Sequence, residues 1–248
     1  MSVLLLRLAG PLQSWGSSAR FTRRSTENAP TKSGVLGLLA AAQGRTRESD
    51  VSDLAALRYG VRIDQPGSRL RDFQTAHHAD SGKAMPLSER FYLADAIFVA
   101  GVEGDSRLVQ ELYDALLEPG FLPFLGRRSC PPSQPITMGP PENASLDDAL
   151  RSTPWQASDW YVRRRRGRVN AVKDLDILID SPVGEDPHIS IRDVPLSFNP
   201  RHRLYGLRGV HTSHITTPPR PASPTPAAPP HEPTTGLKPV RTAPPRTS

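Results

Sequence analysis

The stretch ADAIFVAGVEGDSRLVQELYDALL, residues 94–117, carries the clearest fold signal in the sequence. Residues 94–102 form a short apolar run of the kind found in strands that are buried on both faces. In residues 106–117, leucine recurs at every fourth position from Leu108 to Leu116, which predicts an amphipathic helix. A buried strand followed by such a helix indicates a fold in which helices pack against a sheet.

The region upstream repeats this pairing of strand and helix. The apolar run at residues 3–8 ends at a Gly-Pro pair and is typical of a buried strand. Residues 31–43 carry apolar positions at helical spacing, and Gly44 is placed to cap the C-terminus of that helix. Residues 59–63 predict a further strand, which a long excursion at residues 67–93 separates from the stretch quoted above. This order of elements is that of a ferredoxin-like or RRM-like βαββαβ unit.

A β-rich region with a weaker sequence signal follows at residues 131–215. Its strand candidates lie at residues 160–164, 172–179, 188–192 and 203–210. We therefore expect an α+β fold, with a ferredoxin-like domain at residues 1–130 and a smaller β-rich C-terminal region after it.

The last segment, residues 216–248, is dominated by proline. Proline blocks helices and sheet ladders alike, and the segment holds almost nothing apolar to bury. It predicts a disordered, Pro-rich tail. Four basic residues stand there against the single acid Glu232, so half of the formal net charge of +6 lies outside the predicted fold.

The composition narrows the class of protein. Only four of the 31 basic residues are lysines, a ratio that genome composition explains as readily as phosphate binding does. The single cysteine, Cys130, excludes a disulfide framework and a cysteine-built zinc site, and no cofactor is expected. The N-terminal apolar run is too short for a signal peptide, and no run approaches the roughly 20 apolar residues of a membrane helix. We therefore expect a soluble, cytoplasmic protein without membrane contact.

Four clusters contain residues that could carry function. The first, GPLQSWG at residues 10–16, directly follows the first predicted strand. Gln13, an exposed Trp15 and Gly16 could form a platform there that stacks on a nucleotide and hydrogen-bonds to it. The alternative is a plain turn in which Trp15 packs over the core.

The second cluster, PTKSG at residues 30–34, begins the first predicted helix. Lys32, Ser33 and Gly34 offer a cation, a hydroxyl and backbone N–H groups at a helix N-terminus, which suits a phosphate. A P-loop would need glycine at positions 26 and 31, where this sequence has threonine, so a nucleotide triphosphatase is not indicated. The alternative is ordinary N-capping by Thr31 or Ser33.

The third cluster is Gly126-Arg127-Arg128, in a loop bounded by prolines. Two guanidinium groups beside a flexible backbone suit a phosphodiester, because arginine forms forked hydrogen bonds to phosphate. The alternative is a solvated surface pair.

The fourth cluster is the excursion at residues 67–93, where basic residues are interleaved with aromatic ones. They are Arg69, Arg71, His77, His78, Lys83 and Arg90, with Phe73, Phe91 and Tyr92. Such interleaving suggests contact with RNA. His77 and His78 could form half of a metal site, but no second pair of ligands lies near them in the sequence. A separate arginine-rich run at residues 163–168 is equally consistent with a solvated strand face and with a stripe that contacts a nucleic-acid backbone.

Together these blocks resemble the CasD family, the type I-E branch of the fifth family of Cas proteins. Several blocks occur in the family's order along most of the chain, which is a strong signal although each block alone would be weak. They are LRLAGPLQSWG (6–16), APTKSGVLGLLAAAQG (29–44), LRDFQT (70–75), RFYLADAIF (90–98) and FLPFLGRRSCPPSQP (121–135), with a weaker echo in IRDVPLSF (191–198). The tail from residue 216 has no counterpart in the family.

The resemblance implies a non-catalytic RNA-binding subunit of a type I-E Cascade complex, acting in CRISPR antiviral defence. Such a subunit has a RAMP-type, RRM-like domain and caps the 5′ handle of the CRISPR RNA (crRNA), beside the backbone subunit CasC and the large subunit CasA. The excursion would be an inserted β-hairpin, the thumb, which kinks the RNA. The implied RNA-binding residues, with no catalytic residue and no metal, are Gln13, Trp15, Gly16, Lys32, Ser33, Gly34, Arg71, Arg90, Gly126, Arg127 and Arg128.

Two alternatives stay open at this stage. In the type I-C branch of the same family, a metal-free endoribonuclease cuts the CRISPR repeat with a tyrosine, a lysine and a histidine. Tyr92, Lys83 and either His77 or His78 are near one another in this sequence, so residue types do not exclude that chemistry. The other alternative is an RRM-type RNA-binding module outside CRISPR systems, although the aromatic-rich RNP1 pattern of an RRM is missing from the predicted strand at residues 94–102.

Overall fold

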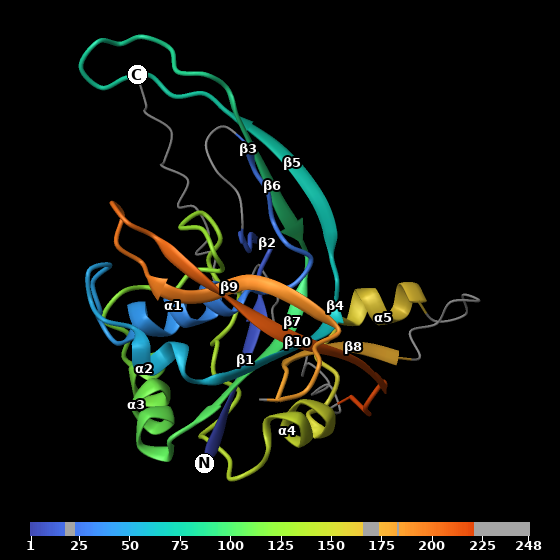
Figure 1. Cartoon of the computed structure of the whole chain (residues 1–248). Helices are drawn as coiled ribbons and strands as arrows, with labels where there is room; N and C mark the ends of the chain where they lie inside the picture. Colours follow the sequence, from blue (N-terminus) through green and yellow to red (C-terminus); the bar gives the residue numbers. More distant parts are fainter. Residues whose placement is uncertain (18–22, 166–173, 183, 221–248) are drawn as a thin grey trace, which may run out of the picture.

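A six-stranded antiparallel sheet runs through the molecule in the order β1-β7-β4-β8-β10-β9 (Figure 1). The computed structural model describes residues 1–17, 23–165, 174–182 and 184–220. The strands are β1 (Ser2–Ala9), β4 (Arg58–Gln65), β7 (Ile97–Gly104), β8 (Asp174–Asp180), β9 (Ile189–Ser197) and β10 (Leu204–Thr216). Because β8 pairs with β4, the β-rich C-terminal region extends the sheet of the N-terminal region.

Two helices, α1 and α3, cover one face of this sheet. Leu4, Leu6 and Leu8 alternate along β1 toward this layer, as the twofold period of a strand requires, and all three are fully buried. Each helix starts at a side-chain cap: Thr31 accepts a hydrogen bond from the backbone of α1, and Asp105 does the same for α3. The elements are α1 (Lys32–Ala42), α2 (Ser52–Ala55) and α3 (Ser106–Leu117), which confirms both predicted helices.

The opposite face of the sheet is covered by two short helices, α4 (Leu146–Ser152) and α5 (Asp159–Arg165). Residues 160–164 were predicted to be a strand, and that prediction is wrong. Tyr161 and Val162 are adjacent buried residues instead of alternating ones, and three arginines lie in the last turn of α5, where cations stabilise the helix dipole. The arginine-rich run continues to residue 168, and residues 166–168 lie outside the described part of the chain.

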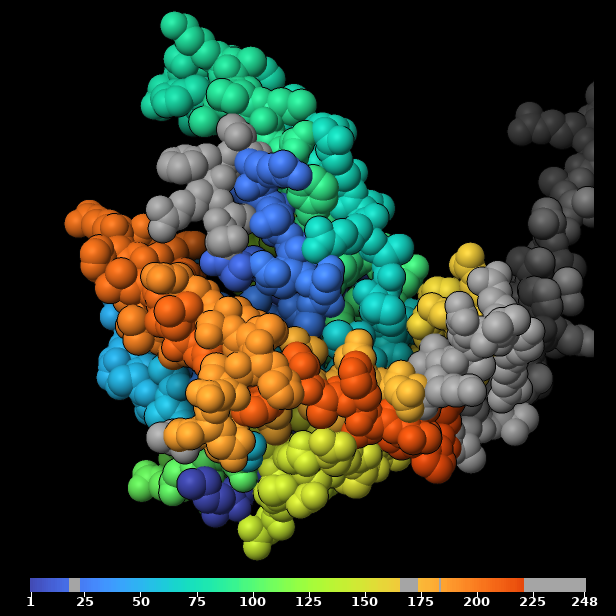
Figure 2. All heavy atoms as spheres, turned by 45° about the vertical axis from the view of Figure 1, so that its right-hand side comes forward, coloured from blue at the N-terminus to red at the C-terminus, as the bar shows by residue number. Residues whose placement is uncertain are grey.

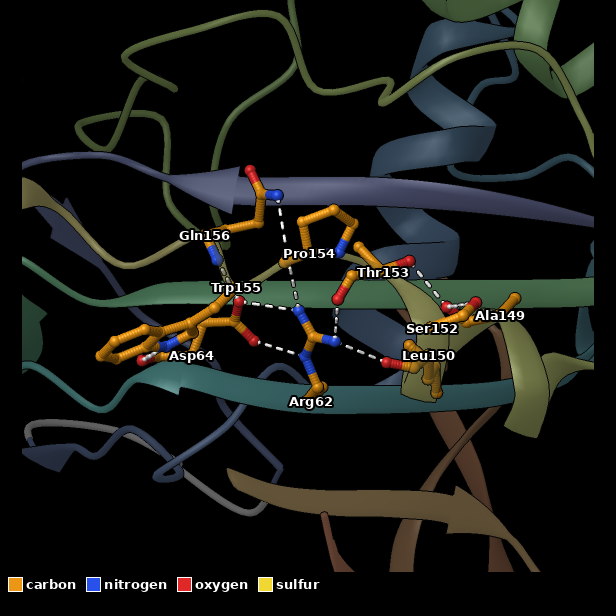
Figure 3. A network of polar contacts seen from close by, with 9 residues as sticks. All are labelled: Arg62, Asp64, Ala149, Leu150, Ser152, Thr153, Pro154, Trp155 and Gln156. Atoms are coloured by element: carbon orange, nitrogen blue, oxygen red, sulfur yellow. Dashed lines mark hydrogen bonds and ion pairs between the residues drawn. The ribbon is translucent and has the colours of Figure 1, made fainter. Parts of the chain in front are cut away.

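A buried ion pair within β4, between Arg62 and Asp64, is hydrogen-bonded through Arg62 to the end of α4 (Figure 3). The Nε of Arg62 lies 2.7 Å from one carboxylate oxygen of Asp64, and Nη2 lies 2.9 Å from the other. The remaining N–H groups donate to the carbonyl oxygens of Leu150, Thr153 and Pro154. Burial raises the pKa of Asp64, and the hydrogen bonds from Arg62 oppose that shift. No sequence motif predicted this pair, and its hydrogen bonds hold the C-terminal end of α4 on the sheet.

A second, smaller sheet carries a long β-hairpin that projects from the body of the molecule (Figure 1). Strand β6 lies at its centre and pairs with β5 in an antiparallel register that runs from Ser68 opposite Ala94 to Gln74 opposite Ser88. The excursion predicted at residues 67–93 is therefore a β-hairpin, called the β5–β6 hairpin below. The strands are β2 (Leu12–Gln13), β3 (Arg23–Arg24), β5 (Ser68–Gln74) and β6 (Ser88–Ala94).

The described chain continues past the predicted start of the tail. Thr216 is the last residue of β10 and pairs with Asp174, so a disordered tail does not begin at residue 216. Arg220 donates to the Ala157 carbonyl oxygen at 2.9 Å and to the Asp159 carboxylate at 2.7 Å. Residues 221–248 lie outside the described residues. Among the helices that are described, none is long and apolar enough to span a membrane.

Candidate functional site

A groove with a volume of about 970 Å³ opens beside the start of α1, the loop after α3 and the end of the β9–β10 hairpin. In Figure 2 the blue N-terminal residues lie between the projecting β5–β6 hairpin and the orange β9–β10 region. The groove brings together residues of the first three sequence clusters with residues that the sequence did not single out. Its lining residues are Ser14, Trp15, Gly16, Ser17, Arg24, Ser25, Thr31, Ser33, Gly34, Gly126, Arg127, Arg192, Phe198, Arg203, Leu204 and Tyr205.

The lining of the groove is strongly cationic. The described residues that line it include Arg24, Arg127, Arg192 and Arg203, and no aspartate or glutamate. The side chains of Arg24, Arg192 and Arg203 make no hydrogen bond or ion pair within the described part of the chain. Arg127 lies with its guanidinium carbon 4.6 Å from the centroid of the Tyr92 ring and donates to the Arg24 carbonyl oxygen, but its buried Nη1 has no partner among the described residues. Unpaired guanidinium groups around serine and threonine hydroxyls suit a chain of phosphates.

Gly126 explains how the third cluster reaches the groove. Its φ of +83° lies in the left-handed region, and a Cβ atom at this position would lie 1.8 Å from the Ser14 carbonyl oxygen. The loop therefore packs directly against the segment after β2, and the Ser14 N–H donates to the Leu125 carbonyl oxygen at 3.1 Å. This contact places Arg127 in the groove, whereas Arg128 is exposed and does not line it.

Gln13 and Trp15 are buried, so the predicted exposed stacking platform is wrong. Both side chains have no exposed surface. The Gln13 amide donates to the carbonyl oxygens of Leu8 and Ala96 and accepts from the Trp15 indole N–H at 3.1 Å. The ring of Trp15 packs on Gly34, where a Cβ atom would lie only 2.7 Å from it. These two polar side chains satisfy each other in the core, and of the three predicted contact residues of the cluster Gly16 alone is exposed.

Lys32 is paired inside the protein, contrary to the prediction that its cation is free for phosphate. Its side chain is 6% exposed, and Nζ lies 2.9 Å from the carboxylate of Asp180. The backbone N–H of Lys32 donates to the carboxylate of Asp193 at 2.8 Å. The helix N-terminus therefore binds an anion, as expected, but that anion is the chain's own aspartate. Ser33 and Gly34 still line the groove.

Arg208 completes this network, called the Lys32 network below: Lys32, Asp180, Asp193 and Arg208. The guanidinium donates to Asp180 at 2.7 Å and to Asp193 at 2.6 and 3.0 Å. Burial alone would lower the pKa of Arg208, but the hydrogen bonds and charges of Asp193 and Asp180 outweigh it and hold that pKa above its usual value. The Tyr59 N–H also donates to Asp180. The network therefore fastens β8, β9 and β10 to the start of α1, and with them the second side of the groove.

The two remaining predicted site residues belong to the β5–β6 hairpin. Arg71 pairs with Glu89, and its guanidinium lies 4.5 Å from the centroid of the Phe73 ring, outside the groove lining. Arg90 is aligned with Arg24 in the pairing of β6 with β3, and its buried Nε has no partner among the described residues. Strand β3, which carries the groove residue Arg24 and pairs with β6, therefore connects the groove to the hairpin.

The residues of the alternative nuclease are not brought together. Tyr92 is 3% exposed and lies under Arg127 near the base of the hairpin, whereas His77, His78 and Lys83 lie at its tip. Tyr92 lies four positions along β6 from Ser88, on the order of 13 Å, and the tip lies beyond Ser88. A general base must lie within hydrogen-bond reach of the proton that it takes, and no such arrangement of these side chains exists here.

The sequence missed the second side of the groove. Arg192 and Phe198 lie in the block IRDVPLSF, whose resemblance was only weak, and Arg203, Leu204 and Tyr205 lie in a predicted strand with no motif of its own. No local pattern marks these residues, because they reach the groove only through the pairing of β9 with β10.

Comparison with known proteins gives consistent results. The family model described as CRISPR-associated protein (Cas_Cas5) matches residues 3–211. The CRISPR system Cascade subunit CasD of Escherichia coli (strain K12) is 36% identical over 170 residues, which cover 60% of this chain and 75% of that protein. A solved structure titled "Crystal structure of Cas protein" is 36% identical with a TM-score of 0.69, covering 89% of this chain and all of that one. A chain of a "CRISPR RNA-guided surveillance complex" is 30% identical with a TM-score of 0.72, covering 87% of this chain and 91% of that chain.

Proposed function

The chain belongs to the family of CRISPR-associated proteins described as Cas_Cas5, and we propose that it is a non-catalytic Cascade subunit that caps the 5′ handle of crRNA. The similarity to a subunit of Cascade and to a chain of an RNA-guided surveillance complex supports this role. The RNA lies in the groove described above. The type I-E branch, antiviral defence and a place beside CasC and CasA follow from the same role.

The observation that carries the proposal is the charge of the groove. Among its described lining residues are four arginines and no acidic residue, and three of these arginines have no partner within the described chain. Unpaired cations at such density repel one another, which is tolerable where a polyanion neutralises them. Phosphates of single-stranded RNA supply that charge, and hydroxyls such as those of Ser25 and Ser33 can bind the ribose and phosphate oxygens.

The topology supports the finer assignment to a ferredoxin-like RAMP domain. The strands β1, β7 and β4 lie side by side, and α1 and α3 cover one face, as in a βαββαβ unit. The β5–β6 hairpin is inserted between β4 and β7, where the resemblance places the thumb. Since β6 pairs with β3, RNA that leaves the groove past Arg24 meets the hairpin next, and we assign the hairpin the role of kinking it.

The test measures binding of synthetic RNA with the repeat sequence of the host's CRISPR array, over a series of salt concentrations. Replacing Arg127 and Arg128 by alanine should weaken binding and reduce the slope of log K against log salt by about 0.7 for each lost phosphate contact on single-stranded RNA. The matched control replaces Arg47 and Arg107, two exposed arginines outside the groove lining, and should leave the slope unchanged.

An equal slope in both double variants would contradict the proposal. The same samples test the non-catalytic role: RNA recovered after single-turnover incubation should be full-length. A specific cleavage product that disappears in a variant of His77, His78 and Lys83 would favour the nuclease instead.

A further inference from the structure

The end of the β9–β10 hairpin gives the groove a second side with its own chemistry. We call Arg192, Phe198, Arg203, Leu204 and Tyr205 the β9–β10 wall; all five line the groove. The wall combines two aromatic rings with two cations that have no partner among the described residues, whereas the loop at Gly126 offers a cation and backbone. A wall of this composition can hold a base as well as phosphates.

Two irregularities in the strand pairing shape this wall. Leu204 pairs with Ser197 and Tyr205 with Pro195, so Leu196 is an extra residue in β9. A β-bulge of this kind changes the direction of the side chains next to it. Leu204 and Tyr205 are consecutive residues of β10 and both line the groove, whereas consecutive residues of a regular strand point to opposite faces. Arg203, just before the strand, lines the groove as well.

The second irregularity anchors the wall. Gly206 pairs with Val194 and Leu207 with Arg192, so Asp193 is the extra residue of this bulge. Its carboxylate bonds to the N–H of Lys32 at the start of α1 and to Arg208. Asp193 is 1% exposed, so the wall is tied to α1 by a buried contact and cannot swing freely.

The two aromatic rings are placed differently. Phe198 packs on α1, where a Cβ atom at Gly37 would lie 3.4 Å from its ring. Tyr205 is partly exposed, and its hydroxyl makes no hydrogen bond within the described residues. Arg203 directly precedes β10, two positions before Tyr205, and Arg192 lies on the neighbouring strand β9, opposite Leu207. Tyr205 is thus the ring that is free to stack, with one cation just before β10 and another on β9.

We propose that the β9–β10 wall is a nucleotide subsite for single-stranded RNA, in which Tyr205 stacks on one base and Arg192 and Arg203 bind the phosphates that flank it. This inference rests on the proposed function and adds a base contact to it. A stacked base is held in one orientation, so the subsite fixes the register of the RNA in a groove whose other contacts are with the backbone. Leu204, beside the ring, offers an apolar contact to the edge of the same base.

The experiment uses the full chain and repeat RNA that carries the fluorescent base 2-aminopurine at successive positions. One position should be quenched on binding, because stacking on an aromatic ring quenches this base. Tyr205→Leu should restore its fluorescence and weaken binding about 5- to 150-fold, the range for loss of one base–aromatic stack. Tyr205→Phe keeps the ring and should keep both the quenching and the affinity.

A second pair of variants tests the cations independently of the ring. Arg203→Ala should reduce the salt slope by about 0.7, as one lost phosphate contact does on single-stranded RNA. Arg201→Ala removes another exposed charge two residues away, outside the groove lining, and should leave the slope unchanged. Thermal unfolding of each variant shows whether the fold is retained, and the arginine pair keeps the test valid if Tyr205→Leu does not fold.

The outcomes separate the two proposals. If Tyr205→Leu and Arg203→Ala bind like the wild type while Arg127→Ala lowers the salt slope, the subsite is overturned and the handle-binding function stands. If the wild-type chain does not bind repeat RNA, the proposed function fails first and the subsite fails with it.

Discussion

The arginines of the interior and those of the groove differ in what surrounds them. Arg62 directs every guanidinium N–H at Asp64 or at a carbonyl oxygen and has no exposed surface. Arg24, Arg192 and Arg203 have no such partner within the described residues. Composition cannot separate the two sets, because arginine supplies nearly all the positive charge of this chain. What distinguishes the two sets is an acidic partner within the protein. An arginine paired with a buried carboxylate stabilises the fold, whereas an arginine without such a partner is available to bind a ligand.

This difference has an energetic consequence that can be measured. Removing one partner of a buried ion pair leaves an uncompensated charge in a low-dielectric site and is strongly destabilising. Removing an exposed, unpaired cation changes stability little, because water already solvates it. The same arginine substitution should therefore lower stability but not the salt dependence of RNA binding in the interior. In the groove it should lower the salt dependence of RNA binding but hardly change stability.

The largest effect is expected from Arg62→Met. It leaves the Asp64 carboxylate buried without its partner and three carbonyl oxygens without a donor, so the free energy of unfolding should fall by about 3–5 kcal/mol. Urea unfolding followed by circular dichroism measures this loss. At a temperature where the variant is folded, the salt slope of RNA binding should equal that of the wild type.

Arg192→Met is the matched control, since it makes the same substitution in the groove. It should change the free energy of unfolding by less than about 0.5 kcal/mol and reduce the salt slope by about 0.7. Equal losses of stability in Arg62→Met and Arg192→Met would contradict the distinction between paired and unpaired arginines.

Lys32→Met sharpens the comparison, because Lys32 resembles a phosphate ligand by sequence and a paired cation by structure. Asp180 keeps the hydrogen bonds from Arg208 and from the Tyr59 N–H, so the loss of stability should be about 1.5–3 kcal/mol, the worth of one charged hydrogen bond. RNA affinity should fall because the β9–β10 wall is less firmly seated on α1, but the salt slope should not change. A slope lower by about 0.7 would show that Lys32 contacts a phosphate directly.

The sequence predicted those parts of the fold that repeat along the chain. Periodic apolar residues located β1, α1, β7 and α3 to within a few residues. Helix α5 was predicted as a strand because its buried Tyr161 and Val162 are too few to show a period. The Lys32 network could not be predicted, since Lys32 and Asp180 are 148 positions apart and only the pairing of β4 with β8 brings them together.

The candidate site likewise has parts that the sequence predicted and parts that it did not. Short motifs located the segments around Gly16, Ser33 and Arg127, which all line the groove. A motif does not show which way its side chains point, so Trp15 was expected at the surface although it lies in the core. Tyr205 carries no local signal at all, because a strand bulge places it in the groove.

The smallest effect is expected from Asp53→Asn. It tests a partly exposed ion pair, intermediate between the buried pair of Arg62 and the unpaired arginines of the groove. Arg45 donates to both oxygens of Asp53, and Asp53 is 42% exposed while Arg45 is 21% exposed. The hydrogen bond from Arg45 lowers the pKa of Asp53, so the pair stabilises the fold above the unfolded-state pKa of about 3.9. This stabilisation is lost as the pH falls through the lowered folded-state pKa. Because solvent screens the pair, the substitution should cost less than about 1 kcal/mol at pH 7. Urea unfolding at pH 7 and pH 3 should show the difference between wild type and variant shrinking with acid and with added salt. A loss of several kcal/mol that salt does not reduce would place Arg45 with Arg62 among the buried cations.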